Sequence, residues 1–298
     1  MSVKIIQIIV GGCMLSLYRK FPVFIKRICM KAIHLFFQIK KIDIDVHLAE
    51  HCNLKCKGCD NYSPIAEKEF VDAKLLERDF LQLKEIFKKH ISSIRLMGGE
   101  PLLNPEIESI CASTRKIFKD EEIIIISNGV AIPKMNKSFF DCCRDNNIVI
   151  MFTKYPIQFD YDGWCEKINA LGVKCSFYNK EPLKTMFRKP LDLAGKQNPK
   201  EQFDLCLNAN RCVSLKGGKL YTCTTIPNIC HFNKFFKKNL KVTQYDYIDI
   251  FSVTDYREIR KRLNRSVPFC RFCKVKDEEF GIPWEISKKD IKEWADEE

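Results

Sequence analysis

Three cysteines at a fixed spacing are the residues of this chain best suited to chemistry. Cys52, Cys56 and Cys59 follow the pattern C-x3-C-x2-C, and the next cysteine is Cys111. Thiolates are soft ligands that suit zinc, copper(I) and iron–sulfur clusters. A structural zinc ion takes four protein ligands. His51 is a poor fourth ligand because adjacent residues of an extended chain point to opposite sides. Three thiolates on a four-iron cluster leave one iron open to another ligand, which suits catalysis better than structural cross-linking.

A second motif, Gly98-Gly99-Glu100-Pro101, follows the next predicted strand. Two glycines let the backbone approach a ligand, and a carboxylate pairs with an ammonium group. Together the two motifs closely resemble those of the radical S-adenosylmethionine (SAM) enzymes, and the resemblance covers roughly residues 42–275. It implies a [4Fe-4S] cluster on the three cysteines, with SAM chelated to the open iron through its amino and carboxylate groups. It also implies reductive cleavage of SAM to a 5′-deoxyadenosyl radical, which abstracts hydrogen from a substrate that the sequence does not identify.

The resemblance assigns further cofactor contacts. Gly98, Gly99 and Glu100 match the segment that receives the methionine amino group, and Ser127 and Asn128 match positions that line the SAM pocket. Lys154 can pair with the SAM carboxylate or with an anionic substrate, or it is a solvated loop lysine.

One position departs from the family pattern. Members often carry an aromatic residue just before the third cysteine, where it packs on the adenine, but this chain has Gly58. Either Tyr62 or another ring takes over that contact, or the adenine is held by the backbone alone. The sequence identifies no catalytic acid or base.

The motifs fall on an alternating series of strands and helices. Period-two and unbroken apolar runs predict strands, and apolar residues at steps of three and four predict helices. Such an alternation indicates a parallel sheet and an α/β fold. The resemblance to the radical SAM enzymes implies that this fold is a partial (β/α)6-type TIM barrel. Active sites of these barrels lie at the C-terminal strand ends, and every candidate residue above falls there. Strands are predicted over residues 42–48, 92–97, 122–127, 148–153 and 173–178, and helices over 72–90, 105–118, 138–145, 161–171, 255–265 and 287–298.

A second group of cysteines occupies the later part of the chain. Residues 211–222 read as a hairpin around Gly217-Gly218. Pairing Lys216 with Lys219 sets Cys212 opposite Cys223, and opposed positions have Cβ atoms about 5 Å apart. Cys270 and Cys273 add a C-x2-C pair. The resemblance to the SPASM/twitch auxiliary-cluster domain favours Cys206 where the hairpin favours Cys212, and this choice stays open. Cys230 is the weakest candidate, and a four-cysteine zinc site is the alternative to an auxiliary [4Fe-4S] cluster.

These patterns divide the chain into four parts. Residues 1–41 form a basic amphipathic N-terminal segment, 42–190 the partial barrel, 191–275 a small Cys-rich β-hairpin domain for the auxiliary cluster, and 276–298 a C-terminal helix. The remaining cysteines of the barrel fit no metal spacing and read as small core residues; they are Cys111, Cys142, Cys143, Cys165 and Cys175.

Charge and composition narrow the function class. The net charge is +12, and residues 1–41 hold eight Lys or Arg and no acid. Residues 23–41 read as a helix that either lies on an anionic membrane surface or packs against the barrel. No nucleic-acid module is recognisable. Sixteen cysteines in a secreted chain would suggest disulfides, but a low-potential cluster favours a reducing cytoplasm, with a peripheral position at the inner face of the membrane as an extension.

Two functions are weighed. The favoured one is a radical SAM enzyme acting on a small molecule, a glycan precursor or a peptide, and supplied with electrons by a flavodoxin or ferredoxin. The alternative is a non-catalytic zinc- or Fe–S-binding module docked at a membrane surface.

Overall fold

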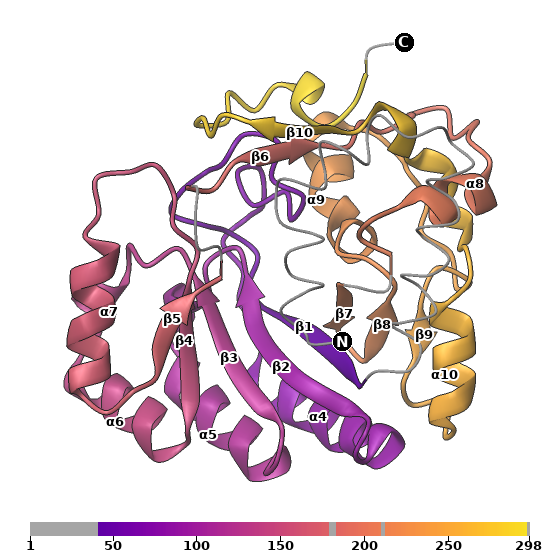
Figure 1. The fold of residues 1–298 in the computed structure, drawn as a ribbon. Coiled ribbons are helices and arrows are strands. Elements are labelled where there is room, and N and C mark those ends of the chain that lie inside the picture. The colour runs from indigo at the N-terminus through magenta and orange to yellow at the C-terminus, as the bar shows by residue number, and fades with distance from the viewer. Residues whose placement is uncertain (1–40, 179–182, 210–211, 297–298) are drawn as a thin grey trace, which may run out of the picture.

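The fold is built on one mostly parallel sheet. The structure is a computed structural model that describes residues 41–178, 183–209 and 212–296. Within them, an eight-stranded sheet has the order β5-β4-β3-β2-β1-β7-β8-β9 (Figure 1). Strands β1 to β5 and β7 run parallel, whereas β8 and β9 are antiparallel additions. The predicted α/β fold is confirmed. The strands are β1 Ile42–Ala49, β2 Ile91–Gly98, β3 Glu122–Ser127, β4 Ile148–Phe152, β5 Cys175–Phe177, β6 Met186–Arg188, β7 Val213–Lys216, β8 Lys219–Tyr221, β9 Ile248–Asp249 and β10 Glu279–Ile282.

Helices return the chain from each parallel strand to the next. Helix α4 starts where the Asp72 carboxylate accepts the Leu75 backbone N–H at 2.8 Å, which satisfies one of the free donors of the first turn. Asn136 and Asp160 cap α6 and α7 in the same way. The helices are α4 Ala73–Phe87, α5 Ile107–Ile117, α6 Lys137–Asp145, α7 Tyr161–Ala170, α8 Pro199–Leu205, α9 Thr225–Phe236 and α10 Tyr256–Leu263.

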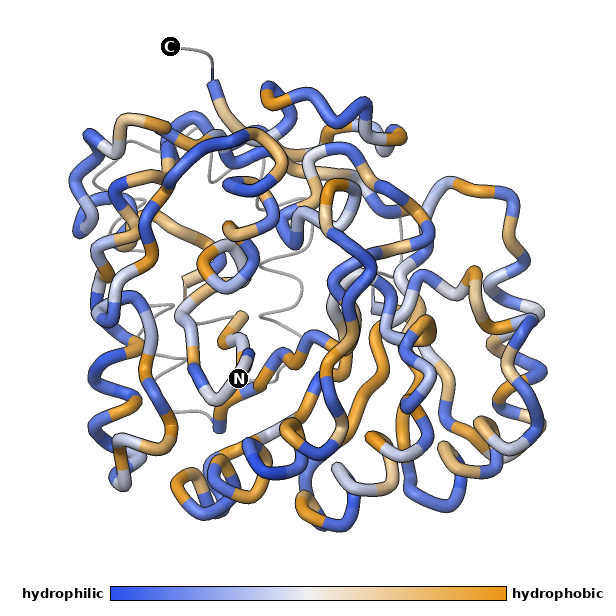
Figure 2. Tube along the Cα trace, turned by 180° about the vertical axis from the view of Figure 1, so that it is seen from behind, coloured by the Kyte–Doolittle hydropathy of each residue, from blue (hydrophilic) through white to orange (hydrophobic). Residues whose placement is uncertain are grey.

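The two faces of the sheet differ in polarity. On β1, Ile44, Val46 and Leu48 point into the main hydrophobic core with the helices, whereas Asp45 and His47 alternate onto the other face and are also buried. Figure 2 shows hydrophobic residues gathered along the central strands and on the helix sides that face them. The core cysteines were predicted correctly: Cys111, Cys143, Cys165 and Cys175 lie in this core, and Cys142 packs against it. The inner face of the sheet therefore carries polar side chains that could contact a ligand.

The predicted hairpin has the predicted register. Lys216 pairs with Lys219 and Ser214 with Tyr221, and the ladder ends there, two residues short of Cys212 and Cys223. Strand β7 also pairs in parallel with β1. The sheet therefore continues across the division expected between residues 190 and 191.

The C-terminal part differs from prediction. No helix covers residues 287–296; a single 3₁₀ turn, Ile291–Glu293, occurs there, preceded by strand β10, which pairs with β6. Backbone hydrogen bonds to residues 55–57 hold residues 285–287 extended, so tertiary pairing overrides the helical pattern. The basic segment expected over residues 1–41 lies, except for Lys41, outside the described residues.

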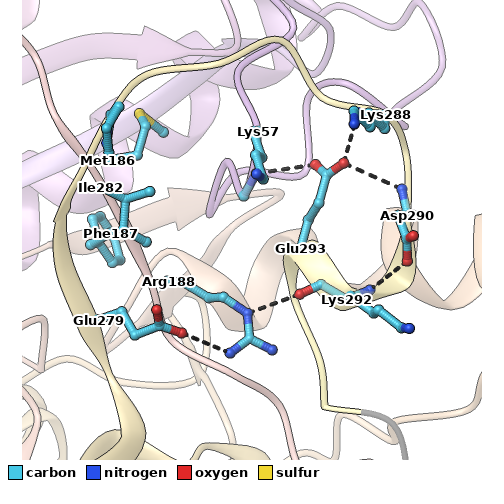
Figure 3. Close-up of a pocket in the computed structure, with 12 residues that line it drawn as sticks. Lys57, Met186, Phe187, Arg188, Glu279, Ile282, Lys288, Asp290, Lys292 and Glu293 are labelled. Carbon is cyan, nitrogen blue, oxygen red and sulfur yellow. Dashed lines mark hydrogen bonds and ion pairs between the residues drawn. The ribbon is translucent and has the colours of Figure 1, made fainter.

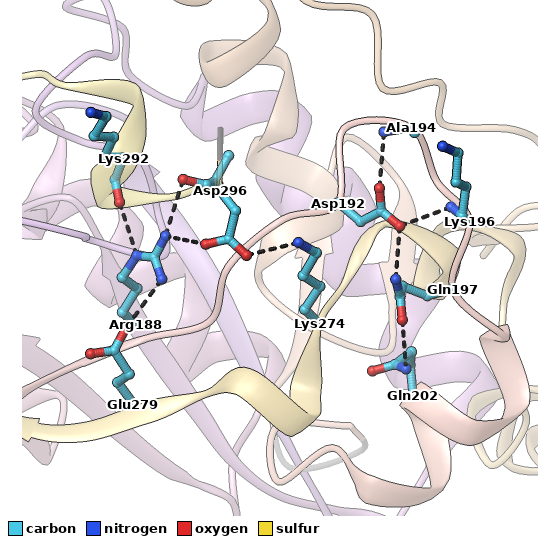
Figure 4. A network of polar contacts seen from close by, with 11 residues as sticks. Arg188, Asp192, Ala194, Lys196, Gln197, Gln202, Lys274, Glu279, Lys292 and Asp296 are labelled. Carbon is cyan, nitrogen blue, oxygen red and sulfur yellow. Dashed lines mark hydrogen bonds and ion pairs between the residues drawn. The ribbon is translucent and has the colours of Figure 1, made fainter. Parts of the chain in front are cut away.

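Charged side chains tie β6 to the end of the chain (Figure 4). The Arg188 guanidinium donates to the Lys292 carbonyl and to the carboxylates of Glu279 and Asp296, at 2.9, 3.1 and 2.7 Å. Lys274 reaches the other oxygen of Asp296 at 2.8 Å. These contacts hold the C-terminal segment across the C-terminal ends of the parallel strands, as Figure 1 shows for β6 and β10.

Candidate metal and cofactor site

The cysteine loop, residues 52–59, follows directly on β1. Its three thiols are free, and Cys56 is buried. Burial raises the pKa of each thiol, that of Cys59 to about 12, and the charges of neighbouring thiols raise the pKa of Cys52 and Cys59 further. The three sulfurs thus lie close enough for their charges to interact. Because a metal ligand must be a thiolate, loading this loop releases protons.

Backbone conformation explains the missing aromatic residue of the loop. Gly58 has φ +63°, and a Cβ there would lie 3.3 Å from the Glu293 carbonyl oxygen. A large side chain is strained at such a φ. Tyr62 does not replace the ring, since it is buried against Phe232 and Trp294. Tyr155 lies nearer the cysteines, where its hydrogen bond with Cys56 is one cause of its raised pKa, after burial.

The Gly-Gly-Glu turn packs on the start of the cysteine loop. The Gly99 N–H donates to the Ala49 carbonyl at 2.8 Å, and the Glu100 N–H donates to the His51 carbonyl at 3.1 Å. A Cβ on Gly99 would lie 2.0 Å from the His51 oxygen, so only glycine permits this approach. The Asn61 side chain, which the sequence reasoning missed, donates to the Gly98 carbonyl at 2.8 Å.

Glu100 joins this turn to the end of β3. Its carboxylate accepts the Ser127 hydroxyl at 2.8 Å, the Asn128 N–H at 2.9 Å and the Leu102 N–H at 3.1 Å. Burial raises the Glu100 pKa to about 7 in spite of these donors. The carboxylate oxygens are therefore already engaged in joining the ends of β2 and β3, and the predicted pairing with an ammonium group would add to these bonds.

Asn128 completes the connection to the cysteines. Its side-chain N–H groups donate to the Asn53 amide oxygen at 2.7 Å and to the Cys52 sulfur at 3.5 Å. The Leu54 backbone N–H also points at that sulfur, at 3.4 Å. Donors directed at a sulfur favour its thiolate form. The structure thus brings the predicted residues Cys52, Glu100, Ser127 and Asn128 into one network.

Lys154 extends from the end of β4 toward α7. Its ammonium group pairs with Asp162 at 2.9 Å and stands over the Phe177 ring, 4.1 Å from the centroid. The side chain is 12% exposed. It lies at the predicted strand end, but its charge is directed to a carboxylate of its own chain.

Residues 279–294, here called the strap, cover the cysteine loop. Ile286 forms an antiparallel bridge with Cys56, the Lys57 N–H donates to the Glu285 carbonyl at 2.9 Å, and the Ser287 N–H donates to the Lys55 carbonyl at 2.8 Å. The Trp284 indole N–H donates to the Cys56 sulfur at 3.1 Å. Sequence reasoning missed this residue, because no spacing links positions so far apart.

A pocket lies between the strap and β6 (Figure 3). Its wall includes Met186, Phe187 and Ile282 on one side and the buried Glu293 on the other. Glu293 accepts the Gly58 N–H at 3.3 Å and the Lys288 N–H at 2.7 Å, so it fastens the loop to the strap. The carboxylate is saturated by its own chain, which makes this a structural joint.

The second group of cysteines separates into two places. Cys206, Cys223 and Cys270 pack with Cys273 on one hydrophobic cluster. Burial raises the pKa of Cys270 and then the charges of Cys273, Cys223 and Cys206 raise it further, so these thiols adjoin one another.

Cys212 lies nearer the inner face of the sheet. Burial, and after it the charge of Asp45, raises the Cys212 pKa to about 12; Arg95 lowers it, and the charges of Asp60 and Cys223 raise it by smaller amounts. Cys230 is exposed on α9. The structure thus brings Cys206 to Cys223, Cys270 and Cys273, and sets Cys212 on the inner face of the sheet.

Further charged residues line that inner face. Arg95 pairs with the buried Asp45 at 2.6 Å, and Lys216 and His231 both reach Glu50, at 2.7 and 2.6 Å. Burial lowers the His47 pKa to about 4, so this ring is neutral, and its Nε2 is buried without a hydrogen-bond partner among the described residues. This face offers both charged and neutral polar contacts.

Neither a site for a single metal ion nor a membrane-spanning helix occurs among the described residues. Over residues 41–178, 183–209 and 212–296, no three His, Cys, Asp or Glu side chains are grouped as a single metal ion would need. In the same ranges, no helix is both long and apolar enough to cross a bilayer.

The part of the chain from β1 to β4 is similar to a known protein family. Residues 46–149, from β1 to β4, match the family model of the Radical SAM superfamily. Molybdenum cofactor biosynthesis protein 1 of Bos taurus is 32% identical over 123 residues, which cover 39% of this chain and 18% of that protein. The mitochondrial GTP 3′,8-cyclase of Arabidopsis thaliana is 27% identical over 119 residues, 39% of this chain and 30% of the cyclase. The chain thus spans less than a third of the length of these relatives.

Solved structures resemble the chain over a longer stretch. The crystal structure of BtrN in complex with AdoMet and 2-DOIA covers 79% of this chain and 93% of BtrN, at 14% identity and a TM-score of 0.46. The anSMEcpe structure with bound AdoMet covers 79% of this chain and 83% of that one, at 14% identity and a TM-score of 0.43. The family match over residues 46–149, which include the cysteine loop and the Gly-Gly-Glu turn, shows that this part of the chain is similar to the radical SAM superfamily.

Proposed function

We propose that this protein is a radical SAM enzyme. The proposal is carried by one observation: the cysteine loop, the Gly-Gly-Glu turn and the end of β3 form a single hydrogen-bonded network that includes the Cys52 sulfur and the Glu100 carboxylate. Members of the superfamily use a [4Fe-4S] cluster and SAM. When bound, these groups supply one-electron cleavage of a carbon–sulfur bond and hydrogen abstraction from a substrate.

The residues fit a cluster held by three thiolates. Cys52, Cys56 and Cys59 are the proposed ligands. Asn128 and Trp284 direct N–H groups at two of the sulfurs, and such donors favour the thiolate form that a cluster ligand needs. For SAM we propose the backbone of Gly98 and Gly99, with Ser127, Asn128 and Glu100 around the amino group.

Lys154 is proposed as the partner of the SAM carboxylate. Its ammonium stands over the Phe177 ring and would have to exchange the exposed Asp162 for the ligand. Exposed ion pairs contribute little, so this exchange costs about 1 kcal/mol or less.

An auxiliary [4Fe-4S] cluster is proposed on Cys206, Cys223, Cys270 and Cys273. Their shared packing supports this set over one that contains Cys212, whose thiol lies by Asp45 and Arg95. The half-buried Lys189 ammonium adjoins these thiols, and their charges raise its pKa against the effect of burial. A cation there would stabilise thiolates.

The substrate is proposed to contact the inner face of the sheet. Arg95 and Asp45 offer a paired charge, and the neutral His47 ring an unused nitrogen. We propose a small molecule, a glycan precursor or a peptide as substrate, a flavodoxin- or ferredoxin-type electron donor, and a cytoplasmic location with peripheral membrane contact through residues 23–41.

The test is anaerobic reconstitution with iron and sulfide, followed by incubation with SAM and dithionite. Formation of 5′-deoxyadenosine is expected for the wild type and for Cys142→Ala, a half-buried thiol on α6 that serves as a matched control. None is expected for Cys52→Ala. Colourless protein that keeps zinc at both cysteine groups, with no cleavage of SAM, would reject the proposal in favour of a metal-binding module.

A further inference from the structure

The strap places one tryptophan on a proposed cluster ligand. Trp284 donates its indole N–H to the Cys56 sulfur at 3.1 Å, shorter than the 3.4 and 3.5 Å of the two donors on Cys52. The Trp284 ring also meets the Tyr155 ring edge-on, with centroids 6.3 Å apart. The Cys56 sulfur thus has the shortest of these N–H contacts, and the strap supplies it.

The donor is held by more than one contact. Backbone hydrogen bonds on both sides of Cys56, at 2.9 and 2.8 Å, fix residues 285 and 287 against the loop. The buried Glu293 carboxylate binds both the loop and the strap. Trp294 donates its own indole N–H to the Cys59 carbonyl at 2.8 Å. Trp284 is therefore set on the sulfur by a fixed scaffold rather than by a mobile side chain alone.

We propose that the Trp284 indole N–H, held by the strap, sets the reduction potential of the cluster that Cys56 ligates. The inference rests on the proposed function, because it requires that cluster. An added electron increases the negative charge on the ligand sulfurs. An N–H donor stabilises the more negative state more strongly, so it raises the potential. Trp284 tunes the electron transfer and takes no part in the chemistry of the substrate.

The chain supplies matched controls, because it contains three tryptophans. Trp284→Phe keeps an aromatic ring and removes the N–H on sulfur. Trp294→Phe removes an N–H that meets a backbone oxygen of the same loop. Trp164→Phe changes a residue on α7. Only the first should change the potential.

The experiment is a redox titration of the reconstituted full chain, followed by electron paramagnetic resonance on the signal that changes when SAM is added. For Trp284→Phe the reduction equilibrium should become about tenfold less favourable, a shift of ~59 mV to lower potential for one electron. The two other variants should titrate like the wild type. Equal potentials for Trp284→Phe and Trp164→Phe would overturn the inference and leave the proposed function standing. A wild-type chain that assembles no SAM-responsive cluster would overturn both.

A second measurement needs no substitution. Wild-type protein labelled with ¹⁵N in the tryptophan indole, reduced and studied by pulsed electron paramagnetic resonance, should show a nitrogen coupling to the cluster. The coupling should persist in Trp164→Phe and Trp294→Phe. Its absence from the wild type would refute the inference even if Trp284→Phe failed to fold.

Discussion

Gly99→Ala is expected to separate the Gly-Gly-Glu turn from the start of the cysteine loop. The new Cβ would lie 2.0 Å from the His51 carbonyl oxygen and 2.4 Å from its carbon, whereas real Cβ contacts stay beyond 3.0 Å. The obstacle is backbone, so the turn or the cysteine loop must move by about 1 Å. Such a shift breaks the bonds from Gly99 to Ala49 and from Glu100 to His51.

The magnitude follows from these losses. Two backbone hydrogen bonds contribute about 1 kcal/mol each, and forcing extra volume into a packed site costs about 1–3 kcal/mol. The free energy of unfolding should therefore fall by about 3–5 kcal/mol, and the iron bound after reconstitution should fall with it.

Urea unfolding of the apo-protein and iron analysis measure the two effects. The matched control is Gly217→Ala, where a Cβ meets nothing within 4 Å and the cost is only that of φ +56°, about 1–2 kcal/mol. If Gly99→Ala loses no more stability than Gly217→Ala and binds iron like the wild type, the close approach of Gly99 to His51 does not restrict this position to glycine.

Three further outcomes are expected. Cys206→Ala should lose the iron of one cluster and Cys212→Ala should keep it, as iron analysis will report; equal losses would contradict the proposed set. His231 and Lys216 lower the Glu50 pKa to about 2 although burial alone would raise it. Glu50 thus stabilises the fold above its ordinary pKa of 4.5, and this contribution is lost as the pH falls toward 2. Glu50→Gln should lower the free energy of unfolding by about 3 kcal/mol at pH 7. It should also make the urea midpoint depend less on pH between pH 4.5 and 2. A pH dependence equal to that of the wild type would contradict this role of Glu50. The buried Asp79 carboxylate accepts the Gly218 N–H at 2.7 Å. In thermal unfolding, Asp79→Ala should lower the free energy of unfolding by about 1–3 kcal/mol, and Asp79→Asn should lower it less. Equal losses for the two variants would exclude a hydrogen-bonding role of Asp79.

The sequence was sufficient for the parallel strands β1 to β5 and for the residues that lie together at the ends of β1, β2 and β3. Apolar runs such as that of β3 reflect burial on both faces of the sheet. This pattern lies within a short stretch of sequence, so it can be recognised before the fold is known. Parallel strands then bring their C-terminal ends to one edge. Hence Cys52, Glu100 and Asn128 could be expected together before their hydrogen bonds were known.

Contacts between distant segments could not be predicted in this way. Residues 287–296 have a helical pattern, yet the backbone groups of Lys55 and Lys57 pair with residues 285 and 287. The proposed choice of Cys206 over Cys212 rests on packing between segments that the hairpin pattern does not describe. Neither signal is local in sequence.

The cysteine loop is translated long before the strap that covers it. Trp284 follows Cys56 by 228 positions. A ribosome therefore exposes all three cysteines of the loop long before it makes the segment that covers them. Iron delivered to the nascent chain would meet thiols still open to water, oxygen and competing metals. The complete surroundings of the proposed cluster can form only after translation has passed Trp284.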